Sequence, residues 1–487
     1  MRTSSLLAAL GCSLALSACV AGPPPEIATP APELPPAFLY APEPGVEANV
    51  AALLPYGDPA FAALSARLLA ENPTLGEALA RIDAARAEAR RAGANRLPLL
   101  TGGADVTASR TNPDQFGGDV PQGAPGGGID FDTERVSYGA TLGASWDADL
   151  FGRLRARERA AVALADARSA DAAAVRIALL SELAGAVIDW RTLADRERAL
   201  RQDLDAAQRL VDLSASRERA GLNPGFDTLR AQGTAAATRT RLAALESERA
   251  RILGRIVTLT AQGGTAVAGA LALGEGDTSL PAAPAATPSL LLANRPDVAA
   301  ASSRLAASDA QLAATAAERF PQLTLSAALG LLAFDIGSLF DEDAIVGSLT
   351  AAIAAPLLDF GRIEAQIDGA AAEKRAAFQA YRGAVYTALG EAEAAYATIA
   401  AADAETAAAA REEAMLARSA RLADTRYRAG LSDFLTVLEA RRAADAAGER
   451  LAIATGRAKR ARVLLWQALG GDPQAESAIP ASRSISQ

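Results

Sequence analysis

The chain has 487 residues, half of them hydrophobic and only 5% aromatic, so apolar material for a large core is ample. Its formal net charge of −9 argues against nucleic acid as a partner, because phosphate binding relies on clustered lysine and arginine. Histidine is absent, which removes the commonest general base and the commonest metal ligand together. We therefore expect a protein that is not an enzyme and that has no metal site and no cofactor.

Residues 1–18 are typical of a secretion signal. Arg2 precedes an apolar run, Leu6 to Leu16, that is too short to span a bilayer as a stable helix. The run ends in Leu16-Ser17-Ala18-Cys19, which resembles the bacterial lipobox, where the cysteine is acylated and becomes the new N-terminus. Val20 follows where an aspartate would favour inner-membrane retention, so the resemblance implies a lipid anchor at Cys19 in the outer membrane. The alternative is an ordinary signal with a coincidental cysteine.

A proline-rich segment, residues 19–57, follows the signal. From Val20 to Pro44 there are nine prolines, which favour an extended tether without a core of its own. Cys12 would leave with the signal, so Cys19 would be the one cysteine of the mature chain, already bound to lipid. We therefore expect no disulfide and no thiolate site.

The next part of the chain predicts helices and then two strands. Asp58-Pro59 and Asn72-Pro73 each place an N-cap residue before a proline, and helical sequence runs to about residue 94. Residues 97–110 and 135–148 then alternate between apolar and small or polar side chains, as strands with one apolar face do. The stretch between them, rich in Gly, Pro, Asn and Asp, predicts a long loop.

Helical sequence resumes at Arg153 and continues to Gly221 without an internal proline. At about 1.5 Å per residue, such a helix is on the order of 100 Å long. Its leucines recur roughly every 3.5 residues, which predicts packing in a coiled coil. After a turn, a second helix runs back to about Thr260.

The same order of elements then recurs. Strands are predicted at 321–333 and 345–357, followed by a helix from Arg362 to a turn at Gly430. Gly152 and Gly361 are 209 positions apart, as are Gly221 and Gly430, so the chain is an internal duplication. We assign the repeats to 58–265 and 289–471, joined by a linker at 266–288 and followed by a tail at 472–487.

Strands with one apolar face in a secreted lipoprotein suggest a membrane barrel, since lipid does not tolerate open sheet edges. Four strands cannot close a barrel, for which about eight are needed, so the chain must oligomerise. The expected fold is an α+β membrane protein whose chains together form the barrel, and three copies would give twelve strands. Very long coiled-coil helices continue that barrel through the periplasm. A soluble sandwich, or a sheet packed on helices, is the alternative.

Several motifs are similar to those of the outer-membrane factors of tripartite efflux pumps, the TolC-like family. They lie in family-like order over nearly the whole mature chain: Ser145–Arg153, Asn294–Val298, Leu357–Arg362, Arg426–Leu431 and Leu465–Gly471. The resemblance implies a homotrimeric duct in the outer membrane that passively conducts exported substrates. It implies two protein partners, a periplasmic adaptor and an inner-membrane transporter, usually of the resistance-nodulation-division type when the duct is a lipoprotein.

The resemblance also assigns roles to individual residues. Leu435 and Glu439, with Asp433 and Asp227 as neighbours, match positions that constrict the periplasmic aperture in the family. Three-fold symmetry would bring like carboxylates together, where repulsion or cation binding could bias opening. In the alternative interpretation these residues have no gating role and belong to a solvated helix face, and Asp433 is an ordinary negative charge at a helix N-terminus.

The turns around Gly221 and Gly430, with Arg219 and Arg428, match the adaptor-contacting tips, although glycine there also serves as a helix C-cap. Two Gly-Arg pairs are expected to shape the strand-to-helix transitions: Gly152-Arg153 and Gly361-Arg362.

Two other functions fit parts of this pattern. The outer-membrane duct of a type I protein secretion system would share the architecture, and lipidation only favours efflux over it. A non-conducting, lipid-anchored coiled-coil scaffold would explain the lipobox and the helices but not four strands placed symmetrically in a duplication. The sequence does not reveal the substrate.

Overall fold

The computed structural model describes residues 26–43, 50–110, 134–222, 224–274 and 280–471. The predicted signal peptide, Cys19, the first loop at 111–133 and the C-terminal tail lie outside these residues. The chain divides into two compact units. Among the described residues, those within 26–29, 84–165 and 303–378 form the first unit, and those within 30–83, 166–302 and 379–471 form the second.

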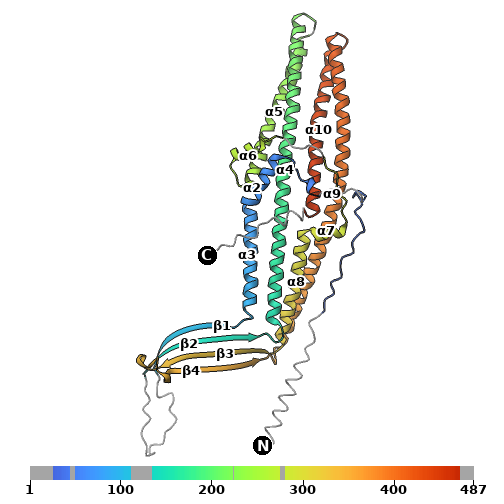
Figure 1. Ribbon diagram of the computed structural model, residues 1–487. Coiled ribbons are helices and arrows are strands. Elements are labelled where there is room, and N and C mark those ends of the chain that lie inside the picture. Colours follow the sequence, from blue (N-terminus) through green and yellow to red (C-terminus); the bar gives the residue numbers. More distant parts are fainter. Residues whose placement is uncertain (1–25, 44–49, 111–133, 223, 275–279, 472–487) are drawn as a thin grey trace, which may run out of the picture. The chain divides into compact units, whose positions relative to one another are not determined.

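The first unit contains a four-stranded antiparallel sheet with the order β1-β2-β3-β4 (Figure 1). The strands are β1 (Leu99–Arg110), β2 (Glu134–Ala148), β3 (Gln322–Ala333) and β4 (Ile345–Ala354). The four predicted strands are thus present. β4 ends three residues before the predicted 357, because Pro356 has no N–H with which to continue a ladder.

The two hairpins of this sheet have the same register. Leu99 lies opposite Ser145 in the first hairpin, and Gln322 lies opposite Ala354 in the second. Gln322 is 223 positions after Leu99, as Pro321 is after Pro98, and Ala354 is 209 positions after Ser145, as Gly361 is after Gly152. The duplication therefore extends to the pairing of individual residues.

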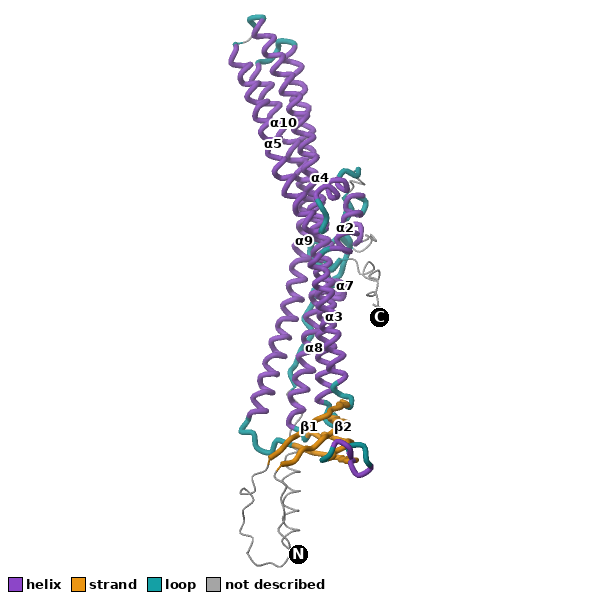
Figure 2. The backbone as a smooth tube through the Cα atoms, turned by 90° about the vertical axis from the view of Figure 1, so that its left-hand side faces the viewer, coloured by secondary structure: helices purple, strands orange, loops and turns teal. Residues whose placement is uncertain are grey.

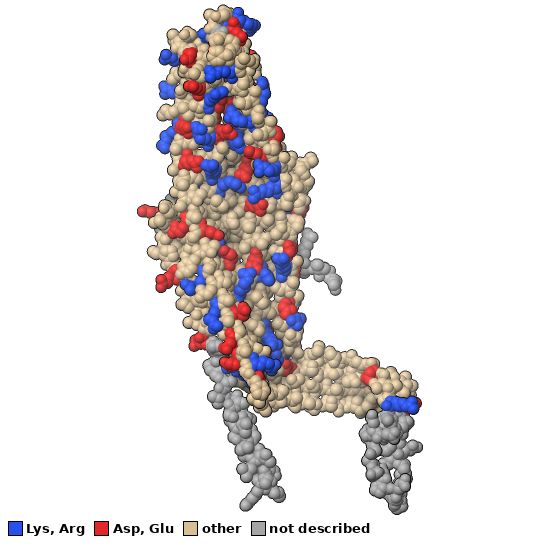
Figure 3. Space-filling model, turned by 180° about the vertical axis from the view of Figure 1, so that it is seen from behind, with Lys and Arg blue, Asp and Glu red and all other residues tan. Residues whose placement is uncertain are grey.

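The sheet exposes much apolar surface. Large hydrophobic side chains on all four strands are exposed, among them Leu100, Val106, Leu142, Leu329, Leu349 and Ile353. The face visible in Figure 3 carries few charged side chains over the sheet. Strands β1 and β4 are the two edges, with one neighbour each in the chain. An apolar sheet with two free edges needs partners beyond a single chain.

The helices of the chain, which Figure 2 shows in purple, include two of 67 residues, as the sequence predicts for the first of them. The helices are α2 (Pro59–Glu71), α3 (Pro73–Ala94), α4 (Arg153–Arg219), α5 (Gly225–Thr260), α6 (Gly264–Leu271), α7 (Pro288–Asn294), α8 (Pro296–Ala316), α9 (Arg362–Arg428) and α10 (Phe434–Ala468). Short 3-10 turns lie at Val50–Leu53, Ala317–Arg319, Ile336–Ser338 and Glu342–Ala344. Among the described helices, none is both long and apolar enough to cross a bilayer.

The predicted N-caps are present. The Asp58 Oδ1 atom accepts a hydrogen bond from the Ala60 N–H at 2.8 Å. The Asn72 Oδ1 atom accepts one from the Leu75 N–H at 3.0 Å. These bonds satisfy N–H groups that a first helical turn leaves without a partner, so α2 and α3 begin where the sequence predicts.

The main core lies in the second unit, where Phe61, Leu183 and Ile256 are fully buried. The proline-rich segment contributes to this core, contrary to the expectation of a tether without one. Phe38 is buried with its ring 5.6 Å from that of Tyr396, and the Leu39 N–H donates to the Glu393 carboxylate at 3.1 Å. Burying one aromatic ring contributes about 2 kcal/mol to the contact between this segment and the core.

Candidate functional site

Two helical hairpins, α4–α5 and α9–α10, end in turns of the same construction (Figure 1). Gly221 and Gly430 have φ of +70° and +75°. At the first turn the Gly221 N–H donates to the Glu218 carbonyl at 2.9 Å and the Leu222 N–H to the Arg217 carbonyl at 2.8 Å. The second turn repeats both bonds 209 positions later. This is the Schellman motif, in which glycine adopts the left-handed conformation at low cost.

Behind these turns an aromatic and aliphatic cluster joins the two hairpins. Tyr427 is buried, with its ring 6.1 Å from that of Phe434 in an edge-on arrangement. The Arg217 guanidinium lies 4.7 Å from the centre of the Tyr427 ring and donates to the Tyr427 carbonyl at 3.0 Å. Leu210, Ala231, Ala423, Val437 and Leu438 complete the cluster. The turns therefore rest on a packed base, which sequence patterns alone did not reveal.

The two arginines predicted at the tips lie on the surface. Arg219 is exposed and donates to Ala215 and Ser216 of its own helix. The Arg428 guanidinium lies 2.9 Å from the Asp424 carboxylate one turn earlier, and its side chain is 57% exposed. Leu222 and Leu431, next to the two glycines, are about two-thirds exposed. The tips thus present both cationic and apolar groups to solvent.

Of the four predicted aperture residues, two share an exposed face of α10. Leu435 is 41% exposed, and Glu439, one turn later, is also exposed. Residues four apart lie on the same side of a helix. Their neighbours Val437 and Leu438 point into the tip cluster, so packing within the chain fixes the direction of this face.

The other two aperture candidates occupy different settings. Asp433 is the N-cap of α10, where its Oδ1 atom accepts from the Thr436 N–H at 2.7 Å. The hydrogen bonds from Thr436 lower the pKa of Asp433, as a capping carboxylate requires. Asp227 lies buried in the first turn of α5. The structure of one chain does not bring the four residues together.

The strand-to-helix transitions lie in the first unit. Gly152 and Gly361 have φ of +76° and +83°, so each strand turns into its helix through a left-handed glycine. The Arg153 guanidinium donates to the Asp147 carboxylate of β2 at 2.7 Å. Arg362 is the first residue of α9, and its N–H donates to the Asp359 carbonyl at 3.2 Å.

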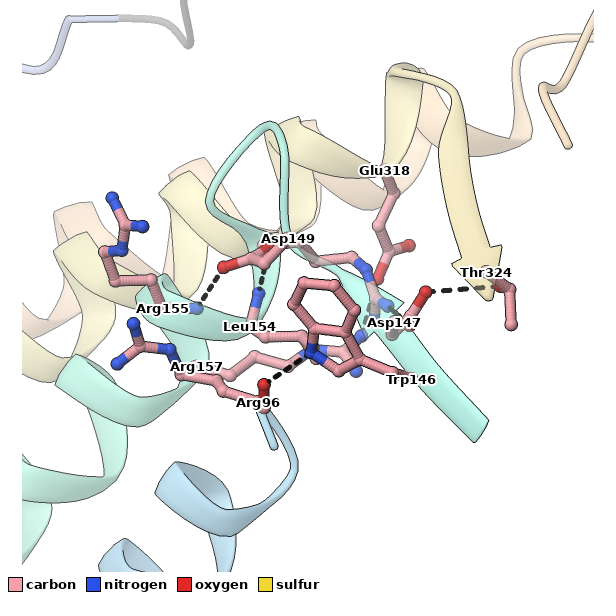
Figure 4. Close-up of polar contacts among 10 residues, drawn as sticks. Arg96, Trp146, Asp147, Asp149, Leu154, Arg155, Arg157, Glu318 and Thr324 are labelled. Atoms are coloured by element: carbon pink, nitrogen blue, oxygen red, sulfur yellow. Dashed lines mark hydrogen bonds and ion pairs between the residues drawn. The ribbon is translucent and has the colours of Figure 1, made fainter. Parts of the chain in front are cut away.

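Aspartates cap both helices at these transitions, from positions that the duplication does not match. Figure 4 shows Asp149, whose two oxygens accept from the Leu154 and Arg155 N–H groups at 2.9 and 2.8 Å. At the second transition Asp359 accepts from the Ile363 N–H at 2.8 Å, and this bond lowers its pKa. Asp149 precedes its helix by four residues and Asp359 by three, so the two repeats cap the helix with an aspartate at different positions.

The first transition also carries an aromatic residue whose polar edge is hydrogen-bonded to the backbone (Figure 4). Trp146, 38% exposed, donates from its indole N–H to the Arg96 carbonyl at 2.8 Å. The Arg96 guanidinium in turn lies 2.5 Å from the Glu158 carboxylate of α4. Tryptophan with its polar edge bonded and its ring exposed is typical of the aromatic girdle at a membrane interface.

Two motifs far apart in the sequence meet at Arg295. Its Nη1 atom donates to the Ala468 carbonyl at 3.0 Å, while Nε and Nη2 bind the Asp297 carboxylate at 2.9 and 2.6 Å. Nη2 also lies 2.7 Å from Glu391. Burial opposes both charged forms, but the hydrogen bonds and the attraction of opposite charges together outweigh it, so the pKa of Arg295 is raised and that of Asp297 is lowered.

Two carboxyl groups face one another between α4 and α10. Burial, together with the neighbouring carboxylate of Asp445, raises the pKa of Asp203 to about 8. Burial also raises the pKa of Asp445, against the hydrogen bond with Asp203 and the charges of Arg241 and Arg441. The pair therefore holds a proton at neutral pH. Nothing in the local sequence pointed to it, because the residues are 242 positions apart.

The sequence model described as outer membrane efflux protein matches residues 64–262 and 287–471, which is most of the chain. The chain belongs to the outer membrane efflux protein family. Both matched segments contain a strand pair and a long helical hairpin, which agrees with the duplication. The recognition of the family from its motifs is confirmed.

Relatives in this family are similar over most of their length. The pyoverdine export outer membrane protein OpmQ of Pseudomonas aeruginosa is 31% identical over 86% of this chain and 87% of its own. Outer membrane protein OprJ of the same organism is 28% identical over 83% and 82%. The outer-membrane channel OprN superposes with a TM-score of 0.78 at 28% identity, covering 92% of this chain and 99% of OprN.

Membership of this family establishes the general function of the chain. The chain is an outer-membrane channel subunit of an efflux pump, not an enzyme. It forms a homotrimer with the predicted α+β fold, extends into the periplasm, and works with an adaptor and an inner-membrane transporter. The trimer accounts for the two free edges of the sheet, since strands of neighbouring chains can pair with both.

Proposed function

We propose that the trimer is a lipid-anchored exit duct for small molecules, and that Leu435 and Glu439 of its three α10 helices close the periplasmic end. The observation that carries the closure is the exposed face of α10. It presents one apolar and one acidic side chain directly after the tip, while Val437 and Leu438 between them are buried in the chain's own cluster. Three-fold symmetry repeats each residue into a ring.

Such a pair of rings has the chemistry of a closed aperture. Three leucines in one ring exclude water, and three carboxylates in the next repel one another unless a cation binds between them. A cation bound between the three carboxylates would stabilise the closed arrangement of the helices, and removal of the carboxylates would abolish this stabilisation. Asp433 and Asp227 serve as secondary acidic groups near the rings in this proposal.

Changing Glu439 to alanine is expected to raise the conductance and the open probability of the purified channel in a planar bilayer. Loss of about 1.4 kcal/mol of closed-state stabilisation would raise the open probability about tenfold. Glu439→Gln separates charge from size. Glu373→Ala, which removes an exposed carboxylate of α9 in the first unit, is the matched control and should conduct like wild type. Equal conductance of all four proteins would exclude Glu439 from the gate.

The exposed tips are proposed to dock the adaptor. Arg219 and Arg428 offer cationic hydrogen-bond donors, and Leu222 and Leu431 offer apolar contacts beside Gly221 and Gly430. An exposed apolar group rimmed by charge is typical of a protein interface. The partner transporter is proposed to be of the resistance-nodulation-division type, as the lipobox favours.

The lipid anchor is proposed at Cys19 on the strength of the lipobox. In the wild-type protein the first residue after processing should be a cysteine carrying acyl chains, seen as added mass on the N-terminal peptide. The Cys19→Ser variant should lack the added acyl mass on its N-terminal peptide, and its unassembled chains should be retained less well by the membrane. An unmodified Cys19 peptide from the mature protein would refute the anchor.

A small-molecule cargo is favoured over protein secretion by the relatives. OpmQ is named for pyoverdine export, and TtgF of Pseudomonas putida, 27% identical over 85% of this chain, is named for toluene efflux. These names describe those proteins. Here they support a small-molecule cargo in place of a secreted protein, and the closed barrel disfavours a non-conducting scaffold.

A further inference from the structure

We propose that in the trimer β4 pairs with β1 of the next chain in a defined register, with Ala351 opposite Val106 of the partner subunit. The family establishes the trimer, and a closed barrel requires each β4 edge to meet a β1 edge. Which residues face each other across that junction is the new inference. The argument uses the duplication, because the junction within one chain has the same construction.

The β2–β3 junction inside the chain pairs the second strand of one repeat with the first strand of the next. The β4–β1 junction between chains does the same. In the first of these Leu142 lies opposite Leu329. Second strands of the two repeats are 209 positions apart, so the counterpart of Leu142 in β4 is Ala351. First strands are 223 positions apart, so the counterpart of Leu329 in β1 is Val106. The same two differences relate the residue pairs of the first hairpin to those of the second. The junction between chains should therefore place Ala351 opposite the partner's Val106.

The faces of the sheet agree with this register. Ala351 lies opposite Leu325, which lies opposite Trp146, so Ala351 belongs to the same face as that tryptophan. Val106 lies opposite Tyr138, which belongs to this face as well. A slip of one residue would place Val106 opposite Thr350 or Ala352, on the other face, and would mix the apolar surface with the polar one.

Side-chain sizes distinguish this register from slips of two residues, which keep the faces correct. In the proposed register Leu349, Ala351 and Ile353 meet the partner's Ala108, the partner's Val106 and the partner's Ala104. Each of these three pairs joins one large and one small side chain, the arrangement that packs best. A slip of two in either direction would set a large residue against the partner's Val106 and leave alanine against alanine at Ala351.

The exposure of these residues fits an interface. Leu349 is 83% exposed, Ile353 73% and Val106 66%, although all belong to regular strands. Pairing with the next chain covers their flanks and satisfies the open edges of β1 and β4.

Cysteine cross-linking of the full-length protein tests the register. Residues directly opposite in antiparallel strands have Cα atoms about 4.5–5.5 Å apart, within disulfide range, whereas diagonal neighbours are about 7–8 Å apart. Within one chain β1 and β4 are separated by two strands, or about 14 Å, so no internal bond competes. Oxidised Ala351→Cys/Val106→Cys trimers should run as covalent trimers on a denaturing, non-reducing gel.

The slip controls are Leu349→Cys/Val106→Cys and Ile353→Cys/Val106→Cys, and we expect the matched pair to cross-link about tenfold more than either. Thr350→Cys/Thr107→Cys tests the same register on the opposite face, in case the first variant does not assemble. Native mass confirms the trimer before oxidation. Stronger cross-linking of a slip control, or failure of both matched pairs in intact trimers, would overturn the proposed register.

Discussion

Replacing Arg295 by methionine is expected to lower the free energy of unfolding by about 2 kcal/mol, because it removes charged hydrogen-bond donors and leaves the buried Ala468 carbonyl without this donor. The Arg295 side chain is only 8% exposed, and its guanidinium binds Asp297, Glu391 and the end of α10 together. Methionine keeps most of the volume but none of the donors. Arg295→Lys should cost less, since a single ammonium retains the charge but not the forked geometry.

Thermal unfolding followed by helical circular dichroism measures this loss in the detergent-solubilised trimer. Arg418→Met is the control, because Arg418 is an exposed arginine of α9. We expect its unfolding temperature to match that of wild type. If Arg295→Met unfolded at the same temperature as Arg418→Met, the meeting of the two motifs would have no structural importance.

The protonated pair of Asp203 and Asp445 is expected to make the helical hairpins less stable as pH rises from about 4 toward 8. The folded chain keeps a proton on Asp203 that an unfolded chain releases near its ordinary pKa of 3.8. Stability contributed by this proton is complete below the ordinary value and is lost as pH rises through about 8. Allowing for partial exposure, the loss is about 1–2 kcal/mol.

Asp203→Asn removes the titration while keeping the shape and a hydrogen-bond donor toward Asp445. The difference in unfolding temperature between wild type and Asp203→Asn, measured from pH 5 to pH 8.5, isolates this pair from every other carboxylate. Wild type should lose stability relative to the variant as pH rises. The groups that face the pair are Arg241, Arg441 and Glu449. Parallel curves would show that Asp203 is ionised throughout.

The sequence predicted the elements of the fold because their signals are local. Alternation with period two located the strands, and capping pairs such as Asp58-Pro59 located helix starts. The duplication then indicated that two hairpins share one construction, which the Schellman turns at Gly221 and Gly430 confirm. Each of these features depends on a few adjacent residues.

The contacts that the sequence did not predict join residues far apart in the chain. Arg295 was part of a motif without a stated role, and its bond to Ala468 spans 173 positions. Phe38 was assigned to a tether, and its contact with Tyr396 depends on where α9 lies. Long-range pairing follows from packing, which periodicity does not specify. The gating roles of Leu435 and Glu439 and the docking role of the tips stay predictions.

The most direct test of the duct is single-channel recording of the purified wild-type protein in a planar bilayer, paired with its native mass. A trimer that conducts in discrete steps is the result this account predicts. A monomer, or a trimer that never conducts, would contradict the account and leave a lipid-anchored helical scaffold as the better description.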